Sequence, residues 1–289
     1  MVARSTLSRP IRGTAAGVPY LALPPASGIS PAPLVLGLHA FEPPRSEAAL
    51  AGAIPMASLP AWRIYLGLPL FGTRLPEGGV PEINRRGERD YLIELFGPVV
   101  EEAAAELRRV TNELRGSLPV TEATALVGVG AGAAAGLLAL AENRLDVDAA
   151  AVINPVVDPA LVISAREKRT ETDYTWTSQA EETRGWLNFL TRADELAHTG
   201  SPLLIINGRQ DEVVPPAQGH ELYSVLARRM PEHALRHIVV PDLAHMIGPE
   251  PGLEPGPLTP AGVLTDRALT EWFHRQLTSP TQLRASEDN

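Results

Sequence analysis

Two residue types that transfer protons stand directly after apolar stretches of the chain. Asp211 lies in the segment NGRQDEVVP, which continues the stretch PLLIING, and His245 lies in PDLAHMIG, which follows LRHIVV. A carboxylate that bonds to one imidazole nitrogen fixes the tautomer and leaves the other nitrogen to transfer a proton. Asp211 and His245 are therefore the candidate catalytic pair.

A glycine-rich turn follows an earlier apolar stretch. Residues 126–136 read LVGVGAGAAAG and contain the frame G-x-G-x-G centred on Gly130. Gly130, Asp211 and His245 each follow a predicted strand, in that order. This order and this frame resemble the nucleophile elbow G-x-S-x-G, the acid and the histidine of the α/β-hydrolase superfamily, in its serine esterase and peptidase form. The resemblance covers residues 19–277.

The resemblance implies a role for each of these positions. Asp211 would orient His245, and Gly130 would stand where the family has its nucleophilic serine. Residues 36–41, LGLHAF, are similar to the family's oxyanion turn, with Ala40 in place of its glycine.

The same resemblance implies an oxyanion hole built from backbone N–H groups. One donor is expected from Ala131, directly after the elbow, and another from Ala40 or Phe41. His39 is a possible pocket residue, and in the family this position more often shapes the oxyanion turn than takes part in the chemistry.

A glycine at the elbow changes the chemistry more than the backbone. Glycine adopts positive φ readily, so Gly130 avoids about 1–3 kcal/mol of strain that another residue would carry there. However, Gly130 has no Oγ, and an acyl-enzyme cannot form on it. Ser117, Ser164 and Ser178 do not lie at a sharp turn from strand to helix, so no replacement nucleophile is expected.

Three hypotheses follow from this pattern. In the first, His245 oriented by Asp211 acts as a general base in non-covalent hydrolase, lyase or cyclase chemistry. In the second, the protein is a pseudo-hydrolase that binds a ligand or acts as a scaffold. In the third, it is a serine esterase or peptidase homologue that carries a serine-to-glycine change at Gly130.

The elements that must position these residues alternate between strand and helix. Several strand-like stretches are apolar on both faces, which is typical of parallel strands covered by helices on each side. The alternation predicts a mostly parallel, doubly wound α/β sheet with helices on both faces. The predicted strands are 19–25, 33–40, 61–69, 124–129, 149–155, 202–209 and 235–242, and the predicted helices are 87–115, 131–143, 216–229 and 261–277.

One segment, residues 160–198, interrupts this alternation. It is interpreted either as a helical excursion on the surface or as a small lid above the site. Its Trp176 and Trp186, together with the apolar segment 65–72, would suit an apolar or acyl-type ligand. The same side chains would equally serve to pack a lid and the end of a strand.

The glycine-rich turn has a second interpretation. The spacing Gly130-x-Gly132-x-x-x-Gly136 is similar to the phosphate-binding turn of short-chain dinucleotide-binding dehydrogenases. In those proteins the turn opens the domain, whereas here it follows several predicted strands, and no Tyr-x-x-x-Lys pair comes after it. This alternative is disfavoured, and no metal-binding motif is present either.

Length and composition set the remaining expectations. One domain is expected over residues 19–277, with an N-terminal segment 1–18 and a disordered tail 278–289. The formal net charge of −9 without a basic cluster disfavours a nucleic-acid partner, and the absence of cysteine excludes disulfides and thiolate chemistry. No export signal or membrane span is evident, so a cytoplasmic location and a small-molecule ligand or substrate are expected, with no membrane partner and no cofactor or metal.

Overall fold

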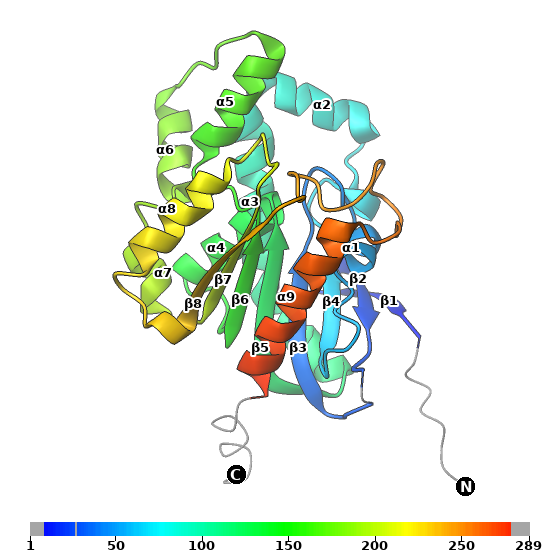
Figure 1. Ribbon diagram of the computed structural model, residues 1–289. Helices are drawn as coiled ribbons and strands as arrows, with labels where there is room; N and C mark the ends of the chain where they lie inside the picture. Colours follow the sequence, from blue (N-terminus) through cyan, green and yellow to red (C-terminus); the bar gives the residue numbers. More distant parts are fainter. Residues whose placement is uncertain (1–8, 27, 279–289) are drawn as a thin grey trace, which may run out of the picture.

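The computed structural model describes residues 9–26 and 28–278, and its centre is an eight-stranded sheet (Figure 1). The strands lie in the order β1-β2-β4-β3-β5-β6-β7-β8, and all neighbours from β4 to β8 are parallel. β2 and β1 add an antiparallel edge. The strands are β1 (Ile11–Ala15), β2 (Val18–Leu23), β3 (Ala32–Leu38), β4 (Trp62–Leu66), β5 (Val120–Val129), β6 (Ala149–Ile153), β7 (Leu203–Gly208) and β8 (Leu235–Val240).

Helices cover both faces of this sheet, which confirms the predicted doubly wound α/β architecture. One face packs against α1 and α9, and the other packs mainly against α3, α4, α7 and α8 (Figure 1). α2, α5 and α6 gather beyond the carboxyl ends of the strands. The helices are α1 (Glu47–Ala53), α2 (Gly79–Asp90), α3 (Gly97–Ser117), α4 (Ala131–Ala141), α5 (Pro159–Thr170), α6 (Ser178–Leu187), α7 (Ala193–His198), α8 (Pro216–Leu226) and α9 (Pro260–Leu277).

Buried apolar side chains on both sides of each central strand hold the layers together. In β3, Leu36 belongs to the core beneath α3 and α4, while Val35 belongs to the core beneath α1 and α9. A strand that is covered on both faces has an uninterrupted run of apolar residues, and for this reason the central strands could be predicted from the sequence. No helix in the described part of the chain is long and apolar enough to cross a membrane.

The predicted helix 87–115 is two helices joined by a π-helical turn at Tyr91–Phe96. The backbone of Asp90 is extended, with φ −158° and ψ 106°, which ends α2. Its carboxylate accepts hydrogen bonds from the N–H groups of Leu92 and Ile93 and so starts the next turn. Apolar spacing continues across this break, so periodicity alone predicted one helix.

The sheet also begins earlier than expected. β1 pairs with β2 from Ile11 onward, so part of the predicted N-terminal segment 1–18 belongs to the domain. At the other end, α9 finishes at Leu277. The predicted disordered tail 278–289 lies outside the described residues, apart from its first residue.

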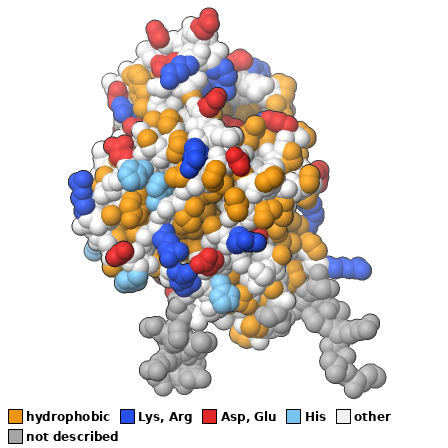
Figure 2. All heavy atoms as spheres, in the orientation of Figure 1, with side chains coloured by type: hydrophobic (Ala, Val, Ile, Leu, Met, Phe, Trp, Pro, Cys, Tyr) orange, Lys and Arg blue, Asp and Glu red, His pale blue; other side chains and the backbone are white. Residues whose placement is uncertain are grey.

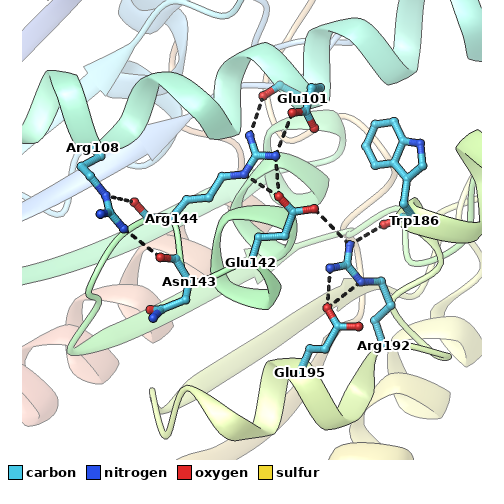
Figure 3. Close-up of polar contacts among 8 residues, drawn as sticks. All are labelled: Glu101, Arg108, Glu142, Asn143, Arg144, Trp186, Arg192 and Glu195. Carbon is cyan, nitrogen blue, oxygen red and sulfur yellow. Dashed lines mark hydrogen bonds and ion pairs between the residues drawn. The ribbon is translucent and has the colours of Figure 1, made fainter.

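The excursion at 160–198 is anchored to the body of the protein at its carboxyl end. Arg192 donates to the carbonyl oxygen of Trp186 at 2.7 Å and pairs with Glu195 and, at 3.5 Å, with Glu142 at the end of α4 (Figure 3). Arg144 also pairs with Glu142, on the side facing α3. Toward its start, α5 and α6 pack against the π-helical turn.

α4 lies so close to the sheet that its first turn requires small residues. A Cβ at Gly132 would stand 2.3 Å from the carbonyl oxygen of His39 and 2.5 Å from that of Leu38. A Cβ at Gly136, one turn later, would be 3.4 Å from the nearest atom of Leu126, an ordinary contact. The first turn of this glycine- and alanine-rich helix therefore lies directly against the carboxyl end of β3.

These two glycines provide a matched test of the packing. We expect Gly132→Ala to lower the free energy of unfolding by about 2–3 kcal/mol or more, because backbone atoms cannot yield to the new methyl group. Gly136→Ala should be neutral or stabilising by up to about 1 kcal/mol, since alanine favours the helix. Urea unfolding measures both, and equal effects of the two substitutions would contradict the close contact.

Candidate active site

The glycine-rich turn has the backbone of a sharp bend from strand to helix. Gly130 lies between β5 and α4 with φ 54° and ψ −114°, in a region of positive φ that glycine adopts without strain. Its N–H donates to the carbonyl oxygen of Ile153 at 3.0 Å. A Cβ at this position would contact Ala40 Cβ at 3.3 Å and His245 Nε2 at 3.9 Å, with no other atom within 4 Å. The bend therefore directs its side-chain position toward the imidazole.

Asp211 and His245 meet although 34 residues separate them. His245 Nδ1 lies 2.8 Å from Asp211 Oδ2, and both residues are buried. The other oxygen of Asp211 accepts hydrogen bonds from the N–H groups of Val213 and Val214. These contacts fix the carboxylate, which in turn directs Nε2 of His245 toward Gly130.

Sequence reasoning missed Asn154, which holds the loop that carries His245 (the histidine loop) to the sheet. This fully buried residue follows β6 with a φ of 44°. Its Nδ2 donates to the carbonyl oxygens of Ala244 at 2.7 Å and His245 at 3.2 Å, and its Oδ1 accepts from the N–H of Gly208 at 2.7 Å. The only sequence signal was its place, an asparagine immediately after a predicted strand.

Sequence reasoning also missed Glu42, the residue after the predicted oxyanion turn. Its Oε2 lies 3.5 Å from Nε2 of His245, on the side of the ring opposite Asp211. The Glu42 side chain is 39% exposed, whereas that of His245 is 8% exposed. The imidazole is thus flanked by two carboxylates, and Glu42 is the one that solvent or a ligand can reach.

These two carboxylates determine the charge of the imidazole. Burial lowers the pKa of His245, but the hydrogen bonds and charges of Asp211 and Glu42 outweigh it and raise the pKa to about 10. For Glu42, burial raises the pKa, yet the contact with His245 dominates and holds it below its ordinary value. Both carboxylates therefore favour the protonated form of the imidazole.

The N–H donors predicted for an oxyanion differ in availability. The N–H of Ala40 donates to the carbonyl oxygen of Pro44 at 3.1 Å, so this predicted donor is already occupied. Among the described residues, no acceptor bonds to the N–H of Phe41 or to that of Ala131 at the start of α4. Ala131 also stands at a helix N-terminus, which favours negative charge. The N–H groups of Ala131 and Phe41 are therefore better candidates than that of Ala40 to bind an oxyanion.

His39 serves the backbone instead of lining a pocket. It is fully buried, its Nε2 accepts the N–H of Leu68 at 2.9 Å, and its Nδ1 lies 2.8 Å from the carbonyl oxygen of Ala40. Burial lowers the pKa of His39 to about 4 and keeps the ring neutral. Both ring nitrogens of His39 thus lie against the backbone of this turn, and its place in a ligand pocket stays a prediction.

Aromatic side chains lie beside the oxyanion turn. Phe41 stacks on Phe71 with ring centroids 4.5 Å apart and meets Phe96 edge-on at 6.0 Å. Tyr91 extends this group, and burial followed by the charge of Glu42 raises its pKa. The aromatic surface nearest Glu42 thus comes from the turn and from the π-helical segment.

The two predicted pocket tryptophans, Trp176 and Trp186, are half-buried and pack against the main core of the sheet. Trp176 also meets Tyr174 edge-on, and Arg184 lies over its ring at 5.4 Å. These contacts account for both residues as packing of the excursion. Whether the excursion acts as a lid stays a prediction.

The comparisons with known proteins agree with this geometry. A model of the prolyl oligopeptidase family of peptidases matches residues 116–252, which include Gly130, Asp211 and His245. The chain has the α/β-hydrolase fold. A glycine-rich turn that follows β5, inside a sheet of this topology, also removes the dinucleotide-binding alternative.

Solved α/β-hydrolase structures share the fold at low sequence identity. The protein TT1662 of Thermus thermophilus is 23% identical, with 94% of this chain and 98% of that chain aligned at a TM-score of 0.69. Est1E of Butyrivibrio proteoclasticus is 13% identical, with 93% of this chain and 99% of that chain aligned at a TM-score of 0.59. An acylaminoacyl peptidase of Pyrococcus horikoshii is 18% identical at a TM-score of 0.63. The alignment covers 94% of this chain but only 42% of that chain. No curated protein matches the sequence significantly.

The buried amide of Asn154 gives a test of how this hydrolase-fold site is held. We expect Asn154→Ala to lower the free energy of unfolding by about 2–4 kcal/mol, because the N–H of Gly208 and two carbonyls lose their partner. The matched control is Asn143→Ala, which also has positive φ, at 50°, but is exposed and has no side-chain hydrogen bond among the described residues. Asn143→Ala should lower the free energy of unfolding by only about 1 kcal/mol. Similar losses in urea unfolding would contradict the role of Asn154.

The raised pKa of His245 predicts a pH-dependent stability. The folded pKa of about 10 exceeds the ordinary value of 6.5, so the contribution is complete below pH 6.5 and is lost as the pH rises through 10. Between those values the free energy of unfolding should fall more steeply for the wild type than for His245→Gln, by up to about 1.4 kcal/mol per pH unit. Parallel curves in urea titrations across this range would show that the folded pKa is not raised.

Proposed function

We propose that this α/β-hydrolase is an enzyme that acts on carbonyl compounds without forming a covalent acyl-enzyme. The observation that carries the proposal is the position of His245 Nε2, 3.9 Å from where a Cβ would stand on Gly130. Asp211 holds the other ring nitrogen at 2.8 Å. A proton-transfer group is thus oriented toward the place where this fold carries its nucleophile, and Gly130 itself has no atom to attack a substrate.

In the proposed reaction, water takes the part of the nucleophile. The carbonyl oxygen of the substrate accepts hydrogen bonds from the N–H groups of Phe41 and Ala131, which stabilise the negative charge that develops on it. His245 begins as an imidazolium, gives its Nε2 proton to the leaving group and regains a proton within the same turnover. Asp211 holds the imidazole ring of His245 in the same orientation throughout the reaction.

The proposed substrates are small acyl compounds with an apolar part. The stacked pair Phe41 and Phe71 lies on the oxyanion turn itself and offers an apolar surface beside the proposed carbonyl site. The structural relatives are similar in kind, since their names describe an acylaminoacyl peptidase and esterases. Both considerations favour esters or amides of apolar acids.

The proposal is tested with p-nitrophenyl butyrate. The wild type should release p-nitrophenol without a burst and without an acyl adduct in the intact mass, and His245→Gln should lower kcat/KM by about 10²-fold or more. The control is His233→Gln, an exposed histidine in the short turn before β8, which should have no effect. An acyl adduct on the wild type, or full activity of His245→Gln, would contradict the proposal. Binding without turnover would instead favour the pseudo-hydrolase hypothesis.

The geometry of Gly130 also supports the hypothesis of a serine-to-glycine change, which makes a separate prediction. A serine there would place its Cβ 3.9 Å from His245 Nε2, within reach of an Oγ hydrogen bond. We expect Gly130→Ser to react with a fluorophosphonate probe, faster as the pH rises toward 10, because His245 becomes a free base only there.

Gly130→Ala is the matched control for that variant. Both substitutions should cost about 1–3 kcal/mol of stability from the positive φ, but alanine brings no hydroxyl and should not be labelled. If the serine variant folds and remains unlabelled across this pH range, the turn does not direct its side chain to His245 as described.

A further inference from the structure

Glu42 lies between the imidazole and the outside of the site. It follows Phe41 directly, so it extends from the same turn that supplies an N–H donor for the proposed oxyanion. Its Oε2 is 3.5 Å from His245 Nε2, and its side chain is 39% exposed. By contrast, Asp211 is buried and both of its oxygens are bound, one to His245 and one to the backbone of its own loop.

The contact between Glu42 and His245 differs from the other ion pairs of this protein. Apart from the His245–Asp211 contact, the other ion pairs among the described residues join a carboxylate to an arginine, and the nearby Arg45 pairs with Glu250 at 3.3 Å. Among the described residues, His245 is the one cation paired with Glu42. Arginine keeps its charge at any working pH, whereas an imidazole can exchange a proton with a carboxylate that reaches it.

We infer that Glu42 is the proton acceptor of the proposed reaction, paired with His245 as the proton donor. This inference rests on the proposed function. Glu42 is exposed enough to meet a water molecule above the turn, and it contacts the nitrogen whose proton the leaving group receives. The pair therefore supplies both proton transfers of a hydrolysis that has no enzyme nucleophile.

The proton balance closes within the pair. A water oxygen forms a bond to the carbonyl carbon, its proton passes to Glu42 Oε2, and the carbonyl electron pair moves onto the oxygen held by the N–H groups. The bond to the leaving group then breaks, and that group takes the Nε2 proton of His245. Glu42 finally returns its proton to Nε2, so acyl compound and water become acid and leaving group while the site regains its resting charges.

The charges around the pair support coupled transfer. His245 faces Asp211 and Glu42, while Glu42 faces His245, Arg45 and, through its charge, Tyr91. The contact with His245 holds the pKa of Glu42 below its ordinary value despite burial. Once Glu42 has taken up the proton of water, its negative charge no longer holds a proton on His245, and the imidazolium becomes a stronger acid for the second transfer.

The experiment compares Glu42→Gln with a matched control, Glu212→Gln. Glutamine keeps the size of the side chain and can accept a hydrogen bond, but it cannot take up a proton. Glu212 is exposed, follows Asp211 directly in the loop after β7, and has no ion pair among the described residues. Hydrolysis of p-nitrophenyl butyrate is measured as a function of pH, and the imidazole signal of His245 is followed by NMR titration in all three proteins.

For Glu42→Gln we expect a fall in kcat of about 10²-fold or more with KM within threefold, and loss of the acidic limb of the pH profile. The NMR midpoint of His245 should drop by about one pH unit or more, and Glu212→Gln should change neither quantity. If Glu42→Gln retains kcat within threefold while His245→Gln does not, Glu42 is not the acceptor.

The two measurements separate the two proposals. An NMR midpoint that Glu42→Gln leaves unmoved overturns the pairing of Glu42 with His245, whatever the activity. A wild type that hydrolyses no faster than His245→Gln overturns the proposed function itself, and with it the catalytic part of Glu42, even if the midpoint shifts.

Discussion

Asn154 joins three parts of the chain through bonds that water cannot replace. Its amide lies in the interior after β6, with the end of β7 on one side and the histidine loop on the other. A buried amide that loses its partners costs several times the net gain of an ordinary hydrogen bond, so this arrangement tolerates little displacement. Asn154 therefore helps to fix the position of His245 relative to the glycine turn, together with Asp211 and the backbone bonds of the same loop.

Glycine and glutamate are complementary at this site. In a serine hydrolase the imidazole must be free to accept the proton of the serine, and a carboxylate on Nε2 would oppose this by holding a proton on the ring. Gly130 brings no hydroxyl to Nε2, and Glu42 provides the partner that this nitrogen would otherwise lack. Gly130 thus brings no side-chain nucleophile to the imidazole, while Glu42 and Asp211 together raise the pKa of His245.

Local signals in the sequence were sufficient for strands β2 to β8, whereas the edge strand β1 and the long-range contacts were not predicted. Apolar runs marked the parallel strands because both of their faces are buried, and the glycine frame marked the turn at Gly130 because few other residues fit there. The break at Asp90 was missed because a side-chain cap lies within continuous apolar spacing. Glu42 and Asn154 were missed because their partners in the histidine loop lie far along the chain, 91 residues from Asn154 in one case.

The arginine network at the end of α4 gives the excursion and the glycine turn different sensitivities to salt. The turn is fixed by apolar packing and buried hydrogen bonds, which dissolved ions screen little. The excursion is tied to α4 through Arg192, Glu142 and Glu195, whose carboxylates are 30% and 47% exposed (Figure 3). The surface around it, seen in Figure 2, carries scattered acidic and basic side chains of the same kind. Ionic strength thus acts on the attachment of the excursion to α4 before it acts on the glycine turn.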